Sequence, residues 1–146
     1  MAVEYEVNGR PRAEEVRALV LSVGWRDPAR HGLELVQRVW DQAPCTVLAR
    51  DEGKLVGMCR AYWDGGLRAE IKNVAVHPDY QHQGIGTRLM ELLLEELDRL
   101  QVRRVTLDSG LGKDKFYERF GFEVRTWVTP MTRSYKEKES DECCSR

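Results

Sequence analysis

The amino-acid sequence predicts a mixed α/β (α+β) fold, with a central sheet of six to seven strands and helices on both of its faces. Segments in which apolar and polar residues alternate, the period of a half-buried strand, are interspersed with segments in which apolar residues recur every three to four positions, the period of an amphipathic helix. Their order is strand, two helices, three strands, then helix and strand twice. A strand–helix–strand unit in such an order makes its strands parallel through a right-handed crossover, while the hairpins before it are antiparallel.

The N-terminal part of the chain carries one strand and two helices. Val3–Val7 (VEYEV) alternates apolar and polar residues and predicts the first strand. Residues 13–23 have apolar side chains at helical spacing and predict the first helix. A second helix is expected over residues 28–40, where the apolar side chains again share one face, and Pro44 ends it.

The central part changes to the period of strands. Residues 45–50 and 55–63 flank a turn at residues 51–54 and predict a hairpin. A tight turn at residues 64–66 then leads into the next strand, Arg68–Val76.

The C-terminal part begins with a helix that buries a face of leucines. The strand after it, at residues 102–107, completes the parallel unit. A short helix is expected at residues 113–120 and two further strands at residues 122–127 and 129–135. The leucines of the buried helix face are Leu89, Leu92, Leu93, Leu97 and Leu100.

Composition limits the class of protein. The chain of 146 residues has 23 basic and 24 acidic side chains, so its net charge of -1 argues against a nucleic-acid partner. No apolar run reaches the roughly 20 residues of a membrane span, and the N-terminus lacks the pattern of a secretory signal. We therefore expect a cytoplasmic protein without membrane contact.

Cysteines and the C-terminal tail complete this picture. The cysteines show no metal-ligand spacing and the last two are adjacent, so we expect no metal site and no disulfide. Residues 136–146 are charged and almost without apolar side chains, which predicts a disordered tail after one domain at residues 1–135. The four cysteines are Cys45, Cys59, Cys143 and Cys144.

One loop ahead of the leucine-rich helix has the chemistry of an anion site. Residues 81–87 (QHQGIGT) place Gly84 and Gly86 at the helix start. The first N–H groups of a helix lack internal partners and the helix dipole adds about half a positive charge, so a phosphate can bind glycine backbone there. Leu89 stands where a dinucleotide-binding pattern needs its third glycine, and the P-loop pattern is absent. A tight strand-to-helix turn would also account for both glycines.

Two motifs together resemble those of the GNAT (Gcn5-related N-acetyltransferase) superfamily. The first is Gln-x-x-Gly-x-Gly at residues 81–86, preceded by Val-Ala-Val-His-Pro-Asp-Tyr, and the second is Phe-Tyr-Glu-Arg-Phe-Gly-Phe at residues 116–122. The order of strands and helices is similar to that superfamily as well. The resemblance implies a GNAT-like fold and an enzyme that takes its acetyl group from acetyl-CoA, without a metal.

The resemblance also implies the cofactor-binding residues. In the superfamily the pyrophosphate of acetyl-CoA lies on the loop that matches residues 81–87. The pantetheine arm pairs with the strand before it like an added strand, where that strand splays from the next one. The implied residues are Val74, Ala75, Val76, Gln81, His82, Gln83, Gly84, Ile85, Gly86 and Thr87.

Two residues are implied for catalysis. The amine must lose a proton before it attacks the thioester, and the departing thiolate leaves more readily when protonated. Tyr117 matches the tyrosine that donates this proton in many members; packing beside Phe116, or a hydrogen bond to the cofactor sulfur, is the alternative. Glu70 matches a glutamate that serves some members as a base through water; a surface carboxylate is the alternative. Asn73 alternates to the other face from Glu70, so both line one cleft only if a bulge intervenes.

The acceptor side is less specified. Trp25, Tyr62 and Trp63 are candidates for the wall of an acceptor pocket, because the segments that carry them flank this site in relatives; ordinary packing accounts for them equally. Gly110 stands where many members carry an asparagine that contacts pantetheine, and a neighbouring side chain or backbone group could substitute.

The sequence thus predicts an acetyl-CoA-dependent N-acetyltransferase that acts on a primary amine by direct attack in a ternary complex. The favoured acceptor is a small-molecule amine of the arylalkylamine or polyamine type. A protein lysine or N-terminus is one alternative, and a non-catalytic acyl-CoA-binding sensor is an alternative of another class. Dimers are common among relatives, so a homodimer is a further expectation.

Overall fold

The computed structural model describes residues 2–134 of the chain. The chain divides into two units, Met1–Asp108 and Ser109–Arg146. Among the described residues, the first unit contains a sheet and three α-helices, and the second contains one short helix, α4 (Asp114–Glu118). The single domain at residues 1–135 stays a prediction.

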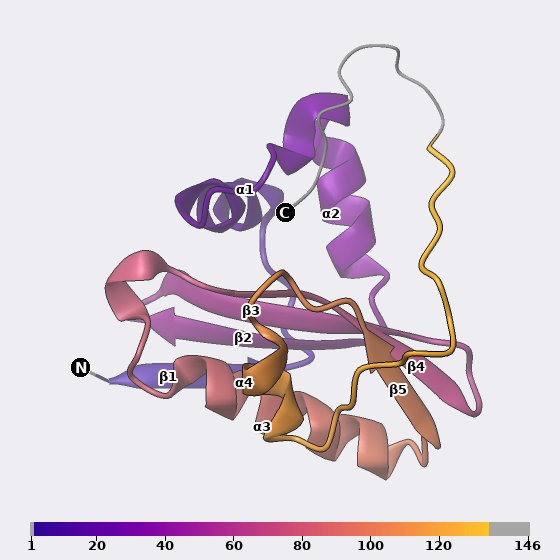
Figure 1. Ribbon diagram of the computed structural model, residues 1–146. Coiled ribbons are helices and arrows are strands. Elements are labelled where there is room, and N and C mark those ends of the chain that lie inside the picture. The colour runs from indigo at the N-terminus through magenta and orange to yellow at the C-terminus, as the bar shows by residue number, and fades with distance from the viewer. Residues whose placement is uncertain (1, 135–146) are drawn as a thin grey trace. The chain divides into compact units, whose positions relative to one another are not determined.

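A five-stranded sheet in the order β1-β2-β3-β4-β5 forms the centre of the first unit (Figure 1). Neighbouring strands are antiparallel from β1 to β4, and β5 runs parallel to β4. The parallel pair is joined by α3 (Ile85–Arg99), which confirms the predicted strand–helix–strand unit. The strands are β1 (Val3–Val7), β2 (Cys45–Asp51), β3 (Lys54–Trp63), β4 (Arg68–Val76) and β5 (Arg104–Leu107).

Helices cover both faces of this sheet. α1 (Ala13–Ser22) and α2 (Leu33–Asp41) lie on one face and α3 lies on the other (Figure 1). Two 3-10 turns, η1 (Pro28–His31) and η2 (Pro78–Tyr80), precede α2 and α3. The predicted mixed α/β class, with helices on both faces, is confirmed.

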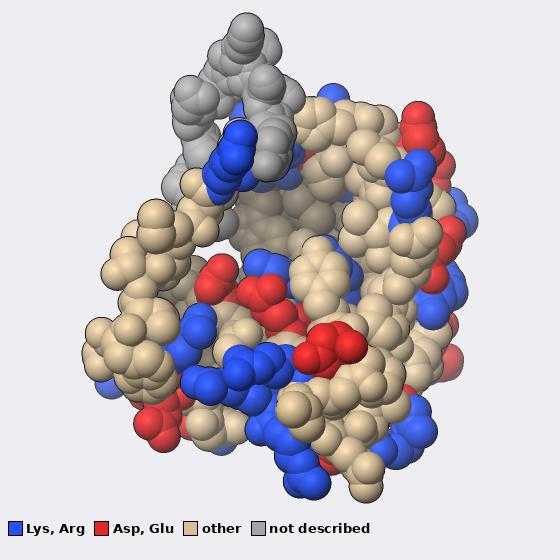
Figure 2. All heavy atoms as spheres, turned by 90° about the vertical axis from the view of Figure 1, so that its right-hand side faces the viewer, with Lys and Arg blue, Asp and Glu red and all other residues tan. Residues whose placement is uncertain are grey.

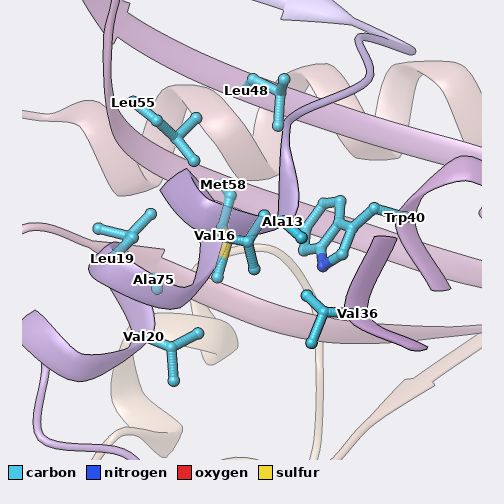
Figure 3. Close-up of a cluster of buried hydrophobic side chains, with 10 residues drawn as sticks. All are labelled: Ala13, Val16, Leu19, Val20, Val36, Trp40, Leu48, Leu55, Met58 and Ala75. Atoms are coloured by element: carbon cyan, nitrogen blue, oxygen red, sulfur yellow. The ribbon is translucent and has the colours of Figure 1, made fainter. Parts of the chain in front are cut away.

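The core on the α1–α2 face joins both helices to the middle of the sheet (Figure 3). Leu48 and Met58 are cross-strand partners on β2 and β3, and they share this buried cluster with Val16 of α1 and Trp40 of α2. Ala75 extends the cluster to β4. Removing these apolar side chains from water holds the two helices against the strands that carry the candidate site.

A second core lies between the sheet and α3. Gly57 of β3 allows the helix to approach closely, because a Cβ there would lie 3.1 Å from Cδ1 of Leu89 and 3.2 Å from Cγ2 of Ile85. This contact holds the first turn of α3, where the loop at residues 81–87 ends. The buried side chains of α3 are Ile85, Leu89, Met90, Leu93 and Leu97.

Two helix predictions are corrected by the structure. The helix predicted over residues 28–40 is interrupted at Gly32, whose φ of 110° favours glycine, so that η1 ends and α2 begins there. On α3, Met90 completes the buried face, whereas Leu92 and Leu100 are only half-buried. The prediction from leucine spacing alone was therefore wrong about one edge of the buried helix face, which includes Met90 and leaves Leu92 and Leu100 partly exposed.

The strand predicted from residue 102 begins later. The backbone N–H of Val102 donates to the carbonyl of Leu97 and closes the last turn of α3, so β5 starts only at Arg104.

The strands predicted at residues 122–127 and 129–135 are wrong for the residues that the structure describes. Residues 122–134 contain no strand, and the sheet has five strands instead of six to seven. Alternation of apolar and polar residues says nothing about a hydrogen-bonding partner, and a strand forms only beside one. Tyr135 and the predicted tail at residues 136–146 lie outside the described residues.

An ion-pair network fastens α1 to β2. Arg50 donates from Nη1 and Nη2 to the two carboxylate oxygens of Glu15, both at 2.9 Å, and from Nε to Glu6 at 3.2 Å. The Glu15 and Arg50 side chains are 14% and 17% exposed. The hydrogen bonds from Arg50 hold the pKa of Glu15 below its ordinary value.

We expect Glu15→Gln to lower the free energy of unfolding by about 1–2 kcal/mol near neutral pH, because it removes a charge-assisted pair with little solvent around it. Since the pKa of Glu15 is lowered in the folded chain, this stabilisation is fully present above the unfolded-state pKa of about 4.3 and is lost as the pH falls through the folded-state value. Urea unfolding across this pH range should show the difference between wild type and variant shrinking toward zero. Glu14→Gln, exposed on the same helical turn, is the control and should change little at any pH.

Candidate active site

The C-terminal half of β4 has one open edge. The pairing of β4 with β5 ends where Ile71 lies opposite Leu107. On the other side, β4 stays paired with β3 as far as Val76. In the part of the chain that the structure describes, the β5-side edge beyond Ile71 therefore has no strand beside it, and an edge of this kind can accept an extended ligand. Val74, Ala75 and Val76 lie in this part of β4.

A β-bulge in β4 decides which side chains share a face. Between two register pairs, one residue of β3 lies opposite two residues of β4, Asn73 and Val74. Asn73 has a φ of 57°, a left-handed conformation that asparagine tolerates better than most residues. Its Oδ1 accepts a hydrogen bond of 2.7 Å from Nε of Arg60, which lies over the ring of Trp40 on the α1–α2 side. The bulge thus brings Asn73 to the face that Glu70 occupies.

Glu70 belongs to a group of polar side chains on this face. Glu70 and Lys72 lie opposite Tyr62 and Arg60 of β3. Nζ of Lys72 is 3.5 Å from the carboxylate of Glu70 and 3.8 Å from that of Asp108, directly after β5. The Glu70 side chain is 39% exposed, so its carboxylate is accessible to an incoming amine. These side chains form the β3–β4 polar cluster, which comprises Arg60, Tyr62, Glu70, Lys72 and Asn73.

The loop at residues 81–87 leads from η2 into α3. Nε2 of Gln81 donates to the carbonyl of Val76 at 2.9 Å and fastens the loop to the end of β4. His82 and Gly84 have left-handed backbones, with φ of 63° and 88°, and residues 81–84 are exposed. Left-handed residues beside a helix N-terminus form concave backbone sites that can bind anions.

The 3-10 turn before this loop is anchored to the end of β2. His77 caps η2, because its Nδ1 accepts a hydrogen bond of 3.1 Å from the N–H of Asp79. The hydroxyl of Tyr80 donates to Oδ2 of Asp51 at 2.7 Å. This hydrogen bond raises the pKa of Tyr80, since the acceptor carboxylate favours the protonated phenol.

The second unit carries Tyr117 on α4. Its ring makes edge-to-face contacts with Phe116, at 5.0 Å between centroids, and with Phe122, at 6.3 Å. These contacts hold the ring, while the role of the hydroxyl as proton donor stays a prediction. Gly110, where many family members carry an asparagine, begins the turn before α4, and its carbonyl accepts a hydrogen bond of 2.9 Å from the N–H of Lys113.

The three aromatic candidates for an acceptor pocket do not share one face. Tyr62 is 47% exposed and belongs to the β3–β4 polar cluster. Trp63 is the next residue of the strand, so its side chain points to the opposite face, and its Nε1 donates to the carbonyl of Gly66 at 3.2 Å. Trp25 follows α1 and packs against the core on the α1–α2 face. Only Tyr62 lies beside Glu70 on the sheet.

Sequence reasoning missed Arg60. The signal was present, because Arg60 interrupts an otherwise apolar strand between Cys59 and Ala61, and an arginine is rarely buried without a specific role. The sequence also carries a signal for the bulge, because an asparagine in the middle of a strand is unfavourable and commonly marks irregular pairing.

Residues 2–134 contain no group of three or more His, Cys, Asp or Glu side chains arranged to hold a metal ion. No helix in that range is long and apolar enough to cross a membrane. Cys45 and Cys59 are buried free thiols, and burial raises the pKa of both. Acidic and basic side chains are interspersed on the face that Figure 2 shows.

Comparison with known families matches residues 16–122 to the Acetyltransferase (GNAT) family. The uncharacterized N-acetyltransferase ycf52 of Pyropia yezoensis is 29% identical over 109 residues, which cover 74% of this chain and 63% of that protein. Histone acetyltransferase TAP1 of Glycine max is 31% identical over 118 residues, which cover 75% of this chain and 51% of that protein. The matched region is thus less than two thirds of these relatives.

Solved structures agree with the family match. A protein of unknown function from meticillin-resistant Staphylococcus aureus, described as a probable acetyltransferase, has a TM-score of 0.81 at 26% identity, over 92% of this chain and 100% of that chain. The family match includes the open edge of β4, the loop at residues 81–87 and α4. This chain belongs to the GNAT acetyltransferase family.

Proposed function

We propose that this protein is an acetyl-CoA-dependent N-acetyltransferase that transfers the acetyl group to a primary amine by direct attack in a ternary complex. The observation that carries the proposal is the open edge of β4, which leads into the exposed loop at the N-terminus of α3. The edge can pair with an extended pantetheine arm, and the loop can bind a pyrophosphate. Membership of the GNAT acetyltransferase family supports the same assignment.

The residues present fit acetyl-CoA as co-substrate. The backbone of Val74, Ala75 and Val76 would hold the pantetheine arm, and the N–H groups at the start of α3 would hold the pyrophosphate. Acetyl-CoA supplies the activated acetyl group, and no metal is needed for this chemistry. The loop residues assigned to binding are Gln81, His82, Gln83, Gly84, Ile85, Gly86 and Thr87.

We expect Gly84→Ala to weaken binding of CoA about tenfold, because a left-handed alanine costs roughly 1–2 kcal/mol and the loop would relax away from the binding conformation. Gly24→Ala is a matched control: its φ is 80° against 88° at Gly84, and at both positions a Cβ would meet nothing within 4 Å. Thermal unfolding should show similar losses in both variants, while calorimetric titration with CoA should show reduced affinity only in Gly84→Ala. Unchanged CoA affinity in Gly84→Ala would contradict the assigned role of the loop.

Two side chains are assigned to proton transfer. Glu70 lies on the accessible face of β4 and is proposed as the base that removes a proton from the amine, directly or through water. Tyr117 is proposed as the acid that protonates the departing thiolate of CoA. The transfer removes one proton from the amine and gives one to the departing thiolate, so the proton that Glu70 takes up balances the one that Tyr117 loses, and exchange with solvent restores both side chains.

We assign a small-molecule primary amine as the acceptor, of the arylalkylamine or polyamine type. Exposed Tyr62 beside Glu70 supports an apolar or aromatic portion next to the reacting amine. The similarity to a protein named histone acetyltransferase keeps a protein amine as the second candidate. Cytoplasmic location, in line with two buried thiols that form no disulfide, and a homodimer stay proposals.

Turnover of acetyl-CoA with a panel of amines, followed through release of free CoA thiol, tests the function. Thiol release that depends on a small amine supports the enzyme, and release only with lysine-containing peptides supports the protein-directed alternative. CoA binding without turnover across both panels would overturn catalysis in favour of an acyl-CoA sensor. Absence of any CoA effect on the melting temperature would exclude both, because a ligand that binds the folded state must stabilise it.

A further inference from the structure

Arg60 is a buried cation on the same face as the proposed base. Only 7% of the residue is exposed. Its Nε donates to Oδ1 of Asn73 at 2.7 Å and its Nη2 donates to the hydroxyl of Tyr62 at 3.3 Å. The remaining nitrogen, Nη1, is buried and has no hydrogen-bond partner. Among the described residues, no carboxylate lies within ion-pair distance of the guanidinium.

Such an arrangement is unfavourable for the folded chain without a bound ligand. A buried charge costs free energy unless it is paired, and a buried donor without an acceptor adds its own desolvation penalty. The carboxylates of Glu70 and Asp108 lie within ion-pair distance of Lys72 instead. The guanidinium therefore has a charge and two N–H donors of Nη1 available for an anionic group.

The surroundings of Arg60 hold it in a fixed orientation. Its guanidinium carbon lies 4.7 Å from the ring centroid of Tyr62 and 5.6 Å from that of Trp40. Trp40 is buried in the core on the α1–α2 face, whereas Tyr62 is half-exposed to solvent. The hydrogen bond from Nε to Asn73 and the two rings thus fix the guanidinium, and Nη1 is the nitrogen left to bind a ligand.

Arg60 is also close to the place where an acceptor amine would react. Arg60 lies opposite Lys72, and the next pair on the same face of the sheet is Tyr62 with Glu70. Diagonal neighbours on one face of a sheet lie roughly 7–8 Å apart, so Arg60 and Glu70 can contact two ends of one small molecule. A cation at one end and a carboxylate at the other complement a zwitterion.

We propose that Arg60 binds an anionic group of the acceptor, so that the substrate is a small primary amine that also carries a carboxylate, such as an amino acid. This inference rests on the proposed acetyl transfer and narrows its acceptor from simple arylalkylamines or polyamines to their carboxylate-bearing counterparts. The carboxylate accepts hydrogen bonds from Nη1, and the amine lies toward Glu70. A carboxylate, with one negative charge, balances one guanidinium, whereas a phosphate monoester carries about two near neutral pH.

The test compares acceptors that differ only in the anionic group. L-Phenylalanine and L-ornithine are each assayed against their carboxamides and against the decarboxylated amines, phenethylamine and putrescine. We expect kcat/KM of wild type to favour the acids about tenfold or more, as a charge-assisted hydrogen bond to a buried arginine implies. The amides provide a demanding control, because an α-amino group beside an amide has a pKa near 8 and loses its proton more readily. Equal or faster turnover of the amides would overturn the proposal.

Variants at Arg60 separate recognition from folding. Arg60→Gln keeps a donor but removes the charge, and it should reduce the preference for acids over amides to about one while the amides lose little. Arg60→Lys keeps the charge without the planar fork and should retain part of the preference. Arg38→Gln, which removes an exposed arginine on α2, is the control and should retain the full preference. A uniform loss across acids and amides in Arg60→Gln would assign Arg60 a purely structural role. If neither Arg60 variant folds, the comparison of acids with their amides in wild type still tests whether the acceptor carries a carboxylate.

Binding measured without turnover distinguishes this proposal from the enzymatic one. The melting temperature of wild type, with CoA present, is recorded with the same acids, amides and decarboxylated amines, and with phosphoethanolamine against ethanolamine. A rise in melting temperature with the acids alone, without thiol release, would support the anion site at Arg60 and contradict catalysis. If amides and simple amines release thiol at least as fast as the acids do, the result would support acetyl transfer and contradict the anion site at Arg60. If phosphoethanolamine raises the melting temperature more than the acids do, the proposal that the anionic group is a carboxylate would be contradicted.

Discussion

Replacing Tyr117 with phenylalanine is expected to lower kcat for acetyl transfer about a hundredfold or more, while KM for acetyl-CoA stays within about threefold of wild type. The variant removes one hydroxyl and keeps the ring. The ring contacts with Phe116 and Phe122 should therefore persist, and the melting temperature, recorded beside the rates, checks that the variant is folded. A tyrosine that protonates the departing thiolate contributes in the transition state, which is why the loss should appear in kcat.

Steady-state and single-turnover rates with acetyl-CoA measure this effect. Tyr5→Phe is the matched control, since Tyr5 is also half-buried but lies on β1, three strands from β4 in the order of the sheet. A kcat within twofold of wild type in Tyr117→Phe would mean that the residue only packs. A raised KM with unchanged kcat would mean that its hydroxyl binds the cofactor without donating a proton.

The proposed base gives a different signature. Glu70→Gln should reduce kcat most at low pH, where nearly all of the amine is protonated, and less as the pH approaches the pKa of the amine near 10. A loss that is independent of pH would argue that Glu70 positions the acceptor or Lys72 and does not remove the proton. The pH–rate profiles of wild type and Glu70→Gln, recorded with one amine, separate these outcomes.

Local features of this chain were predictable and distant pairings were not. Val3–Val7 and Arg68–Val76 appear as strands at the predicted bounds, because alternation and turn residues are written in short segments. The parallel pairing of β4 and β5 followed from the crossover rule. The strands expected after residue 121 failed because their existence depends on a partner that the segment itself does not specify.

The candidate site shows the same division. The loop at residues 81–87 was predictable, because a helix N-terminus and its glycines form one contiguous stretch. The environment of Arg60 was not, since Trp40 and Asn73 are distant from it in the sequence and reach it only through the sheet register. Even the face occupied by Asn73 depends on one extra residue in β4, which no alternation pattern reveals.

Leu89→Ala is expected to lower the free energy of unfolding by about 2–5 kcal/mol, the cost of a cavity in a close-packed core. Leu89 has 0% exposure in the second turn of α3, and its Cδ1 would lie 3.1 Å from a Cβ on Gly57, so it fills the contact that holds the start of the helix on β3. Since the loop at residues 81–87 ends in the preceding turn, we also expect weaker CoA binding. Urea unfolding and calorimetric titration with CoA measure the two effects.

Leu97→Ala provides the comparison that separates them. Leu97 is 1% exposed and lies two turns further along α3, away from the loop. We expect a similar loss of stability, because the same atoms are removed from the same core, but unchanged CoA affinity at a temperature where both variants are folded. If both variants bind CoA equally weakly, affinity follows global stability. If only Leu89→Ala binds weakly, the position of the helix N-terminus itself determines cofactor binding, which is what a backbone anion site at the start of α3 requires.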